Sequence, residues 1–261
     1  MSGPRSQSVA MVSSMTVVFL FLFLQSAAAA DQETGSVRPD LATIVKHISE
    51  AQLQNRERVK AYSVTREYKV FGGGAEQPRT DVVAHVNFLP PSSKNYDIDQ
   101  STGGMGEKVI RHILDHEVDA ARDPKLIMIN DQNYDFEYLD EATLSGTACY
   151  KLGITPRHDR KELLKATIWV DKNSYRILRM EGEPSKSLSF WVKDVHLVLQ
   201  FGEVAGMWLQ TESLALAHLR FGGEYKITSQ DLNYDISHAV AVNVSARHRR
   251  HSSAMMAASV R

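Results

Sequence analysis

The alternation of apolar and polar positions predicts a sheet of many strands. From Tyr62 to Ile236, short segments rich in β-branched and aromatic residues follow one another, and residues typical of turns separate them. In the second half these segments are LKATIWVD (164–171), SYRILRMEGE (174–183), LSFWVKDVHLVLQF (188–201), MWLQTESLALAHLRF (207–221) and EYKITSQDLNY (224–234). Because parallel strands need a long crossover, these short breaks indicate antiparallel neighbours.

One side of the sheet is predicted to be apolar. In the segment TDVVAHVNFL (80–89), Val82, Ala84, Val86 and Phe88 alternate with Val83, His85 and Asn87, and the loop before it carries three glycines at 72–74. A sheet with an apolar face and free edges must close on itself or be covered by other elements.

Two amphipathic helices are available as covers. The first begins behind Pro39 with Asp40 as a plausible N-cap, and Ile44 and Ile48 belong to its apolar stripe. The second spans 106–123, and its apolar residues on or near one side are Val109, Ile113, Leu114 and Val118. The following LIMIN segment (126–130) fits either a short strand or a continuation of this helix.

The two ends of the chain are predicted to lie outside the fold. Residues 1–30 read as a secretory signal cleaved after Ala30, because the apolar run 15–24 is shorter than the roughly 20 residues that span a bilayer. An uncleaved anchor is the alternative. We expect a flexible segment at 31–39, one domain at 40–237 and a disordered tail at 238–261.

Composition excludes several classes of protein. The formal net charge is −1, so nothing indicates binding to nucleic acid. Cys149 is the only cysteine, which excludes an intramolecular disulfide and suits a small buried residue within a strand. Hydrophobic residues make up 43% of the chain, enough for a sizeable core.

The candidate catalytic chemistry is weak. His112 and His116 share a helix face at i, i+4 spacing and could bind zinc, but the pattern departs from H-E-x-x-H because the glutamate, Glu117, follows the second histidine. A solvated helix face that includes Glu117 explains it better. Asp135 and Glu137 fit an exposed strand equally well. We therefore expect no enzyme, no catalytic residue, no metal and no cofactor, and keep a metal-dependent hydrolase using His112 and His116 as a less favoured alternative.

Apolar side chains at strand spacing indicate a ligand cavity instead. Any single one is explained by core packing, but a large sheet with only two helices leaves much concave surface, and large barrels tend to hold ligands. An exported chain of this kind is typical of an acyl-chain binder. The candidate cavity residues are Val64, Tyr68, Val82, Val86, Phe88, Ile168, Trp169, Leu178, Trp191, Leu197 and Trp208.

The order of elements resembles a known superfamily. The segments VNFLPPSSKNYDI (86–98), YKLGITPRHDRKELLKATIWVDKNSYRILRMEGEP (150–184) and SLSFWVKDVHLVLQFGEVAGMWLQTES (187–213) are similar to the periplasmic lipoprotein carrier superfamily, LolA-like with LolB and RseB-type sensors as relatives. The likeness extends over about residues 40–234 and includes the exported proteins named for outer-membrane lipoprotein sorting.

The resemblance implies a mainly β (α+β) fold, an incomplete antiparallel β-barrel whose amphipathic helices cover its concave hydrophobic face. It also implies a periplasmic protein of the cell envelope that shields lipid acyl chains or lipoproteins, a chaperone in protein transport. An RseB-like envelope sensor with a membrane partner is the alternative. Carriers of this family place an arginine before the proline of the first segment, where it hydrogen-bonds the lid; here Leu89 precedes Pro90, and Arg66 is the candidate substitute for that lid contact.

Overall fold

The computed structural model describes residues 40–186, 192–220 and 223–236. The predicted signal peptide (1–30), the segment 31–39 and the predicted tail (238–261) lie outside the described residues, and so does Trp191.

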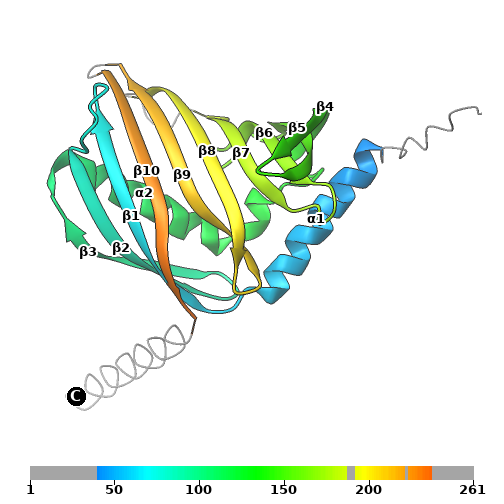
Figure 1. Ribbon diagram of the computed structural model, residues 1–261, viewed down its shortest axis with the longest axis horizontal. Helices are drawn as coiled ribbons and strands as arrows, with labels where there is room; N and C mark the ends of the chain where they lie inside the picture. The colour runs from blue at the N-terminus through cyan, green and yellow to red at the C-terminus, as the bar shows by residue number, and fades with distance from the viewer. Residues whose placement is uncertain (1–39, 187–191, 221–222, 237–261) are drawn as a thin grey trace, which may run out of the picture. The chain divides into compact units, whose positions relative to one another are not determined.

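The described chain forms a ten-stranded antiparallel sheet with two α-helices (Figure 1). The order across the sheet is β3-β2-β1-β10-β9-β8-β7-β6-β5-β4, so β3 and β4 are its free edges. The strands are β1 (Tyr62–Gly72), β2 (Thr80–Leu89), β3 (Ser93–Ser101), β4 (Tyr134–Leu144), β5 (Thr147–Pro156), β6 (Leu164–Asp171), β7 (Ile177–Pro184), β8 (Val192–Val204), β9 (Met207–Leu219) and β10 (Gly223–Asp235). The predicted fold class, a mainly β half-barrel with covering helices, is confirmed.

The helices begin and end near the predicted residues. Helix α1 (Leu41–Arg58) starts at Asp40, whose carboxylate accepts the backbone N–H of Thr43 at 2.7 Å, as the N-cap prediction required. Helix α2 (Gly104–Arg122) follows β3 and leads to a short 3-10 helix, η1 (Pro124–Ile127). The ambiguous 126–130 segment is therefore neither strand nor α-helix, because Pro124 ends α2 and starts a tighter turn.

Strand pairing places both helix-covered regions on one face of the sheet. Residues directly opposite each other in antiparallel strands point to the same side. One such row across the sheet reads Val82, Tyr68, Ser229, Ser213, Leu199, Met180, Ile168, Leu152 and Tyr138. We call the side to which this row points the inner face.

Two separate apolar clusters lie on the inner face. The α1 cluster joins Ile44 and Ile48 of α1 to buried residues of β4 to β7, such as Leu152 and Ile168. The α2 cluster joins Ile110 and Leu114 of α2 to β1 and β2, and its strand members are Val64, Tyr68, Val70, Val82, Ala84 and Val86. Each helix therefore covers its own end of the sheet.

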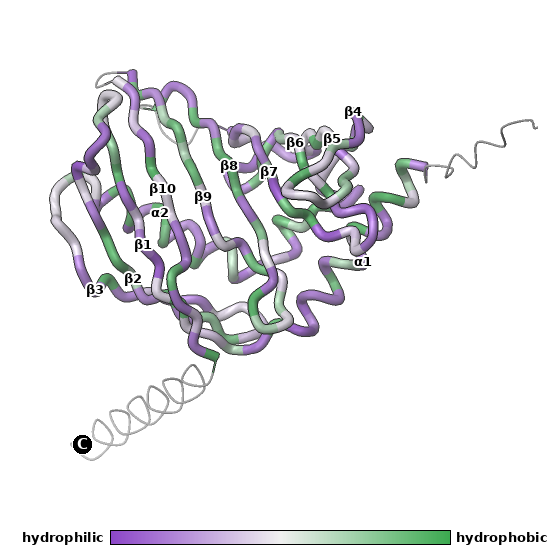
Figure 2. Tube along the Cα trace, in the orientation of Figure 1, coloured by the Kyte–Doolittle hydropathy of each residue, from purple (hydrophilic) through white to green (hydrophobic). Residues whose placement is uncertain are grey.

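The contact residues of α2 differ in part from the sequence prediction. Leu114 is buried as predicted, whereas Val109 is 40% exposed and its neighbour Ile110 is fully buried. The buried stripe of α2 contains Ile110 in place of Val109, because a period of 3.6 residues allows either of two adjacent residues to extend an apolar stripe. Figure 2 shows apolar residues along β1, β2, β8 and β9, interleaved with polar ones.

Close packing of β6 against β7 depends on Gly182. A Cβ atom at this position would lie 2.2 Å from the carbonyl oxygen of Lys165 and 2.5 Å from the Cα of Ala166. Both are backbone atoms of the neighbouring strand and cannot move away alone. Gly182 therefore has a packing role that no other residue type can fill.

We predict that Gly182→Ala lowers the free energy of unfolding by about 1–3 kcal/mol, the usual cost of overpacking. The matched control is Gly202→Ala in β8, where the nearest atom to the new Cβ is Thr211 Cγ2 at 3.4 Å. That change should be neutral or slightly stabilising, since alanine restricts the unfolded chain. Urea denaturation of both variants checks this, and equal stabilities would contradict it.

Candidate functional site

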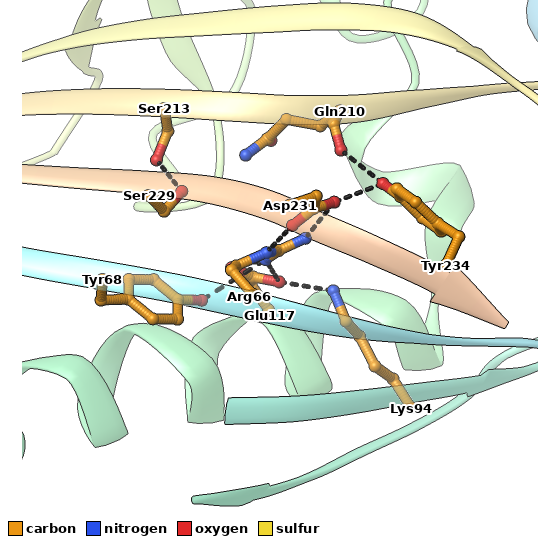
Figure 3. A network of polar contacts seen from close by, with 9 residues as sticks. All are labelled: Arg66, Tyr68, Lys94, Glu117, Gln210, Ser213, Ser229, Asp231 and Tyr234. Carbon is orange, nitrogen blue, oxygen red and sulfur yellow. Dashed lines mark hydrogen bonds and ion pairs between the residues drawn. The ribbon is translucent and has the colours of Figure 1, made fainter. Parts of the chain in front are cut away.

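A buried ion cluster on the inner face joins three strands to α2 (Figure 3). Arg66 of β1 is 6% exposed and its guanidinium contacts carboxylates on two other elements. It binds both carboxylate oxygens of Asp231 on β10, one of them at 3.2 Å, and both oxygens of Glu117 on α2 at 3.0 Å. Tyr68 lies beside it, with its hydroxyl 3.4 Å from the guanidinium.

The cluster is electrically balanced. Lys94 of β3 also contacts the Glu117 carboxylate, and the Tyr234 hydroxyl donates to Asp231. Two cations, Arg66 and Lys94, thus meet two carboxylates. A buried charge is tolerated only when it is paired and hydrogen-bonded, and each member here meets that condition.

These contacts shift the pKa values of the members. Burial alone would raise the pKa of Glu117, but the charges of Lys94 and Arg66 outweigh it and hold the value at about 2. Burial raises the pKa of Tyr62, the first residue of β1, to about 12. Glu117 is therefore ionised and Tyr62 neutral throughout the physiological range.

Between the two clusters the inner face is apolar but incompletely covered. The inner-face residues of this region are only partly buried, whereas inner-face residues under α1 and α2, such as Ile168 and Val82, are fully buried. We call this region the central strip; it consists of Leu197, Leu199 and Phe201 on β8, Ser213, Ala215 and Ala217 on β9, and Tyr225 and Ile227 on β10.

The central strip has a shaped cross-section. The β9 residues are small, and the larger side chains of β8 and β10 flank them on either side. At one end the Ser213 and Ser229 hydroxyls hydrogen-bond each other at 2.7 Å, next to the ion cluster (Figure 3). Most of the strip therefore lies on the side of Ser213 away from the ion cluster, whereas Phe201, which pairs with Gln210, lies on the same side as the cluster.

The structure distributes the predicted cavity residues over different environments. Val64, Tyr68, Val82 and Val86 are buried in the α2 cluster, and Ile168 is buried in the α1 cluster. Phe88 stacks on Tyr62 with ring centroids 5.5 Å apart, and Leu197 packs at the edge of the α1 cluster within the central strip. Of these residues, Leu197 is the one that borders the incompletely covered surface.

The predicted tryptophans and Leu178 lie elsewhere. Trp169 follows the inward-facing Ile168 and so points outward, where Lys151 and Arg179 lie over its ring at 5.5 and 5.4 Å. Leu178 is partly buried and lies outside both clusters, where the β6–β7 register shifts. Trp208 donates its indole N–H to the carbonyl of Ile177 at 2.8 Å and has Arg176 over its ring. Adjacent strand residues cannot share a face, which the predicted set did not respect.

Glu117 is the main residue that sequence reasoning misplaced. It was assigned to a solvated helix face, but it points to the sheet and contacts Arg66 and Lys94. Asp231 belongs to no motif that the sequence displays. Arg66, the predicted substitute lid contact, bonds to α2 through Glu117, whereas Leu89 is a partly buried residue at the end of β2.

Two side-chain amides attach helix α1 to the rest of the fold. The Gln52 amide donates to the carbonyl of Ile129 at 2.8 Å and accepts its N–H at 3.1 Å. One turn later, Asn55 donates to the carbonyl of Trp208 at 2.8 Å and accepts its N–H at 2.7 Å. These paired bonds hold α1 to the segment after η1 and to the start of β9.

Other predicted chemistry is limited in the described part of the chain. Among the residues that the structure describes, no group of three or more His, Cys, Asp or Glu side chains could hold a metal ion. The histidines of α2 contact each other, with 3.1 Å between their Nε2 atoms. Cys149 is a buried free cysteine, as predicted, and burial raises the pKa of its thiol.

Comparison with known proteins gives structural likenesses only. No family model and no curated protein sequence matches the chain. A domain named for outer membrane lipoprotein sorting, from Vibrio parahaemolyticus, matches with a TM-score of 0.41 at 12% identity, covering 72% of this chain and 92% of its own. A DUF1329 family protein from Desulfovibrio piger gives 0.40 at 14%, covering 74% and 93%.

A LolA superfamily protein from Nitrosomonas europaea gives a TM-score of 0.35 at 11% identity, covering 74% of this chain and 92% of its own. The solved structures that match thus include the superfamily that the sequence resembles. At these identities and TM-scores they assign no ligand and no residue role to this chain. Separately, none of the helices within the described residues has the length and apolarity needed to cross a membrane.

We predict that Arg66→Met lowers the free energy of unfolding by about 3–5 kcal/mol, because the Asp231 side chain, 1% exposed, loses its buried counter-ion. Lys94→Met is the control: this cation is nearer the solvent and contacts Glu117, which keeps Arg66 as a partner. Urea denaturation should show that Lys94→Met lowers the free energy of unfolding clearly less than Arg66→Met does. Equal losses for the two variants would show that Asp231 does not depend on Arg66.

The pKa of Glu117 predicts the pH range in which it stabilises the fold. Its folded value of about 2 lies below the usual 4.5, so its contribution is complete above pH 4.5 and is lost as the pH falls towards 2. The difference in free energy of unfolding between the wild type and Glu117→Gln should therefore be constant from pH 5 to 8 and shrink only in more acidic solution. Denaturation at a series of pH values measures it, and a change between pH 5 and 8 would contradict the assignment.

Proposed function

We propose that this chain is an exported, non-catalytic periplasmic protein that binds lipid or lipoprotein and shields acyl chains on its inner face, with a role in outer-membrane lipoprotein sorting. The observation that carries the proposal is the central strip, an apolar surface in the middle of the inner face that the chain itself leaves partly exposed. Its domain is 40–237, and its predicted signal peptide accounts for export.

The chemistry of the strip favours an apolar ligand. Its residues are apolar apart from Ser213 and the hydroxyl of Tyr225, and among the described residues the charges of the neighbouring ion cluster are paired with one another. Burial of methylene groups would supply the binding free energy, about 0.8 kcal/mol for each CH₂. An acyl chain lying along β9 meets these conditions.

Helix α2 is the element that would admit and retain the ligand. It packs on β2 and β3, and Glu117 connects it to Arg66 and Lys94. Helix α1, in contrast, is attached by the paired hydrogen bonds of the Gln52 and Asn55 side-chain amides. We assign the lid to α2 and its latch to the Arg66–Glu117 pair, a different residue arrangement from the arginine-before-proline contact that the resemblance implied.

The direct test is mass spectrometry of organic extracts from protein purified out of the envelope fraction. Recovery of phospholipid or lipoprotein at a fixed ratio to protein is the expected result, and clean extracts would count against binding. Co-purification of a membrane-anchored protein without lipid would favour the alternative, an envelope sensor on the same fold.

A pair of neighbouring substitutions separates binding from folding. Ala215→Trp fills the central strip, whereas Leu216→Trp places the same ring on the outer face, because adjacent strand residues point to opposite sides. We predict that the first lowers bound lipid at least about tenfold, equivalent to 1.4 kcal/mol of binding free energy, and that the second leaves it unchanged. Circular dichroism would check that both variants fold. Equal lipid content in the two would exclude the central strip as the site.

A further inference from the structure

The paired histidines of α2 form a feature that lipid binding does not use. His112 and His116 lie one helical turn apart, and their ring centroids are 4.4 Å apart in an edge-to-face arrangement. Their Nε2 atoms approach to 3.1 Å. His112 is exposed and His116 partly buried, so an ion from solvent can reach the pair.

The separation of the two nitrogens suits a shared metal ion. Metal–nitrogen bonds to imidazole are about 2.0–2.1 Å long, so two Nε2 atoms 3.1 Å apart enclose an angle of about 100° at a metal placed between them. This value lies between the right angle of square-planar sites and the tetrahedral angle. At this separation both Nε2 atoms can bind one cation once the hydrogen that they share has moved.

Within the described part of the chain, no third His, Cys, Asp or Glu side chain joins the pair in a metal-binding group. Asp115 accepts a hydrogen bond from Tyr96 at 2.8 Å, and Asp119 pairs with Arg122 at 2.9 Å. In the loop between β5 and β6, the positive charge of Lys161 disfavours a protonated His116, and the negative charge of Glu162 favours it. Water would therefore complete the coordination.

We propose that His112 and His116 form a two-histidine chelate for a divalent transition cation of the Zn²⁺ and Cu²⁺ class, which imidazole nitrogens prefer. When both rings are neutral, the hydrogen between the Nε2 atoms moves to Nδ1, and both Nε2 lone pairs face the cation. No proton is lost in this step. The sequence alone favoured a solvated helix face here; the converging nitrogens are the observation that changes this interpretation.

Chelation would also stiffen the lid assigned to α2. A cation held by residues i and i+4 fixes one turn of that helix, because both ligands bind only while the turn is helical. Glu117 points to the sheet whereas His112 is exposed and His116 only partly buried, so the cation and the ion cluster would involve different side chains of α2. Chelation does not require that lipid binds.

Zn²⁺ titration of the full mature chain by isothermal calorimetry tests the proposal. The wild type should bind one Zn²⁺ that His112→Ala and His116→Ala each weaken at least about tenfold, the loss typical when a metal site is damaged. His218→Ala is the control, since it removes an exposed imidazole from β9. The histidines at 238, 248 and 251 are present in every variant and contribute equally.

Hydrogen exchange gives a second measurement. Zn²⁺ should slow exchange of the α2 amides in the wild type and in His218→Ala, but not in His116→Ala. Affinities that are the same in the wild type and both α2 variants would overturn the proposal, as would the absence of any Zn²⁺ effect on α2. A pair that only shares a hydrogen bond gives both of these negative results.

Discussion

The need to cover one apolar face of an open sheet governs this structure. Ten antiparallel strands with two free edges cannot bury that face against themselves, because β3 and β4 do not pair. The chain supplies two helices, and each buries an apolar cluster at one end of the face. What they leave is the central strip, where apolar residues are only partly buried. Function is proposed at the place where the covering is incomplete.

The two helices cover the face by different physical means. Helix α1 combines buried isoleucines with the paired hydrogen bonds of the Gln52 and Asn55 side-chain amides, which are directional and involve no charge. Helix α2 combines Ile110 and Leu114 with the ion pair between Glu117 and Arg66. A buried ion pair costs desolvation on formation and gives little net stability, but it defines a single docked position. That difference suits a fixed element beside a movable one.

Sequence periodicity identified the elements well and their contacts less well. The bounds of β2 and the N-cap at Asp40 follow from local patterns of apolar and turn residues. Faces could be assigned only where alternation was clean, as along β2. In β6 and β7 both faces carry large side chains, so Ile168 and Trp169 were assigned together although they point to opposite sides.

Local patterns in the sequence are enough to predict an antiparallel sheet with two amphipathic covers, because strand and helix periods are local properties. Only the tertiary structure decided which surfaces remain exposed and which charges meet. Arg66 and Asp231 are 165 residues apart in the chain, and Glu117 is 51 residues from Arg66. No local pattern encodes such a meeting, since it depends on the register of β1 with β10 and on the position of α2. The converging histidine nitrogens depend likewise on side-chain rotamers, which spacing alone does not specify.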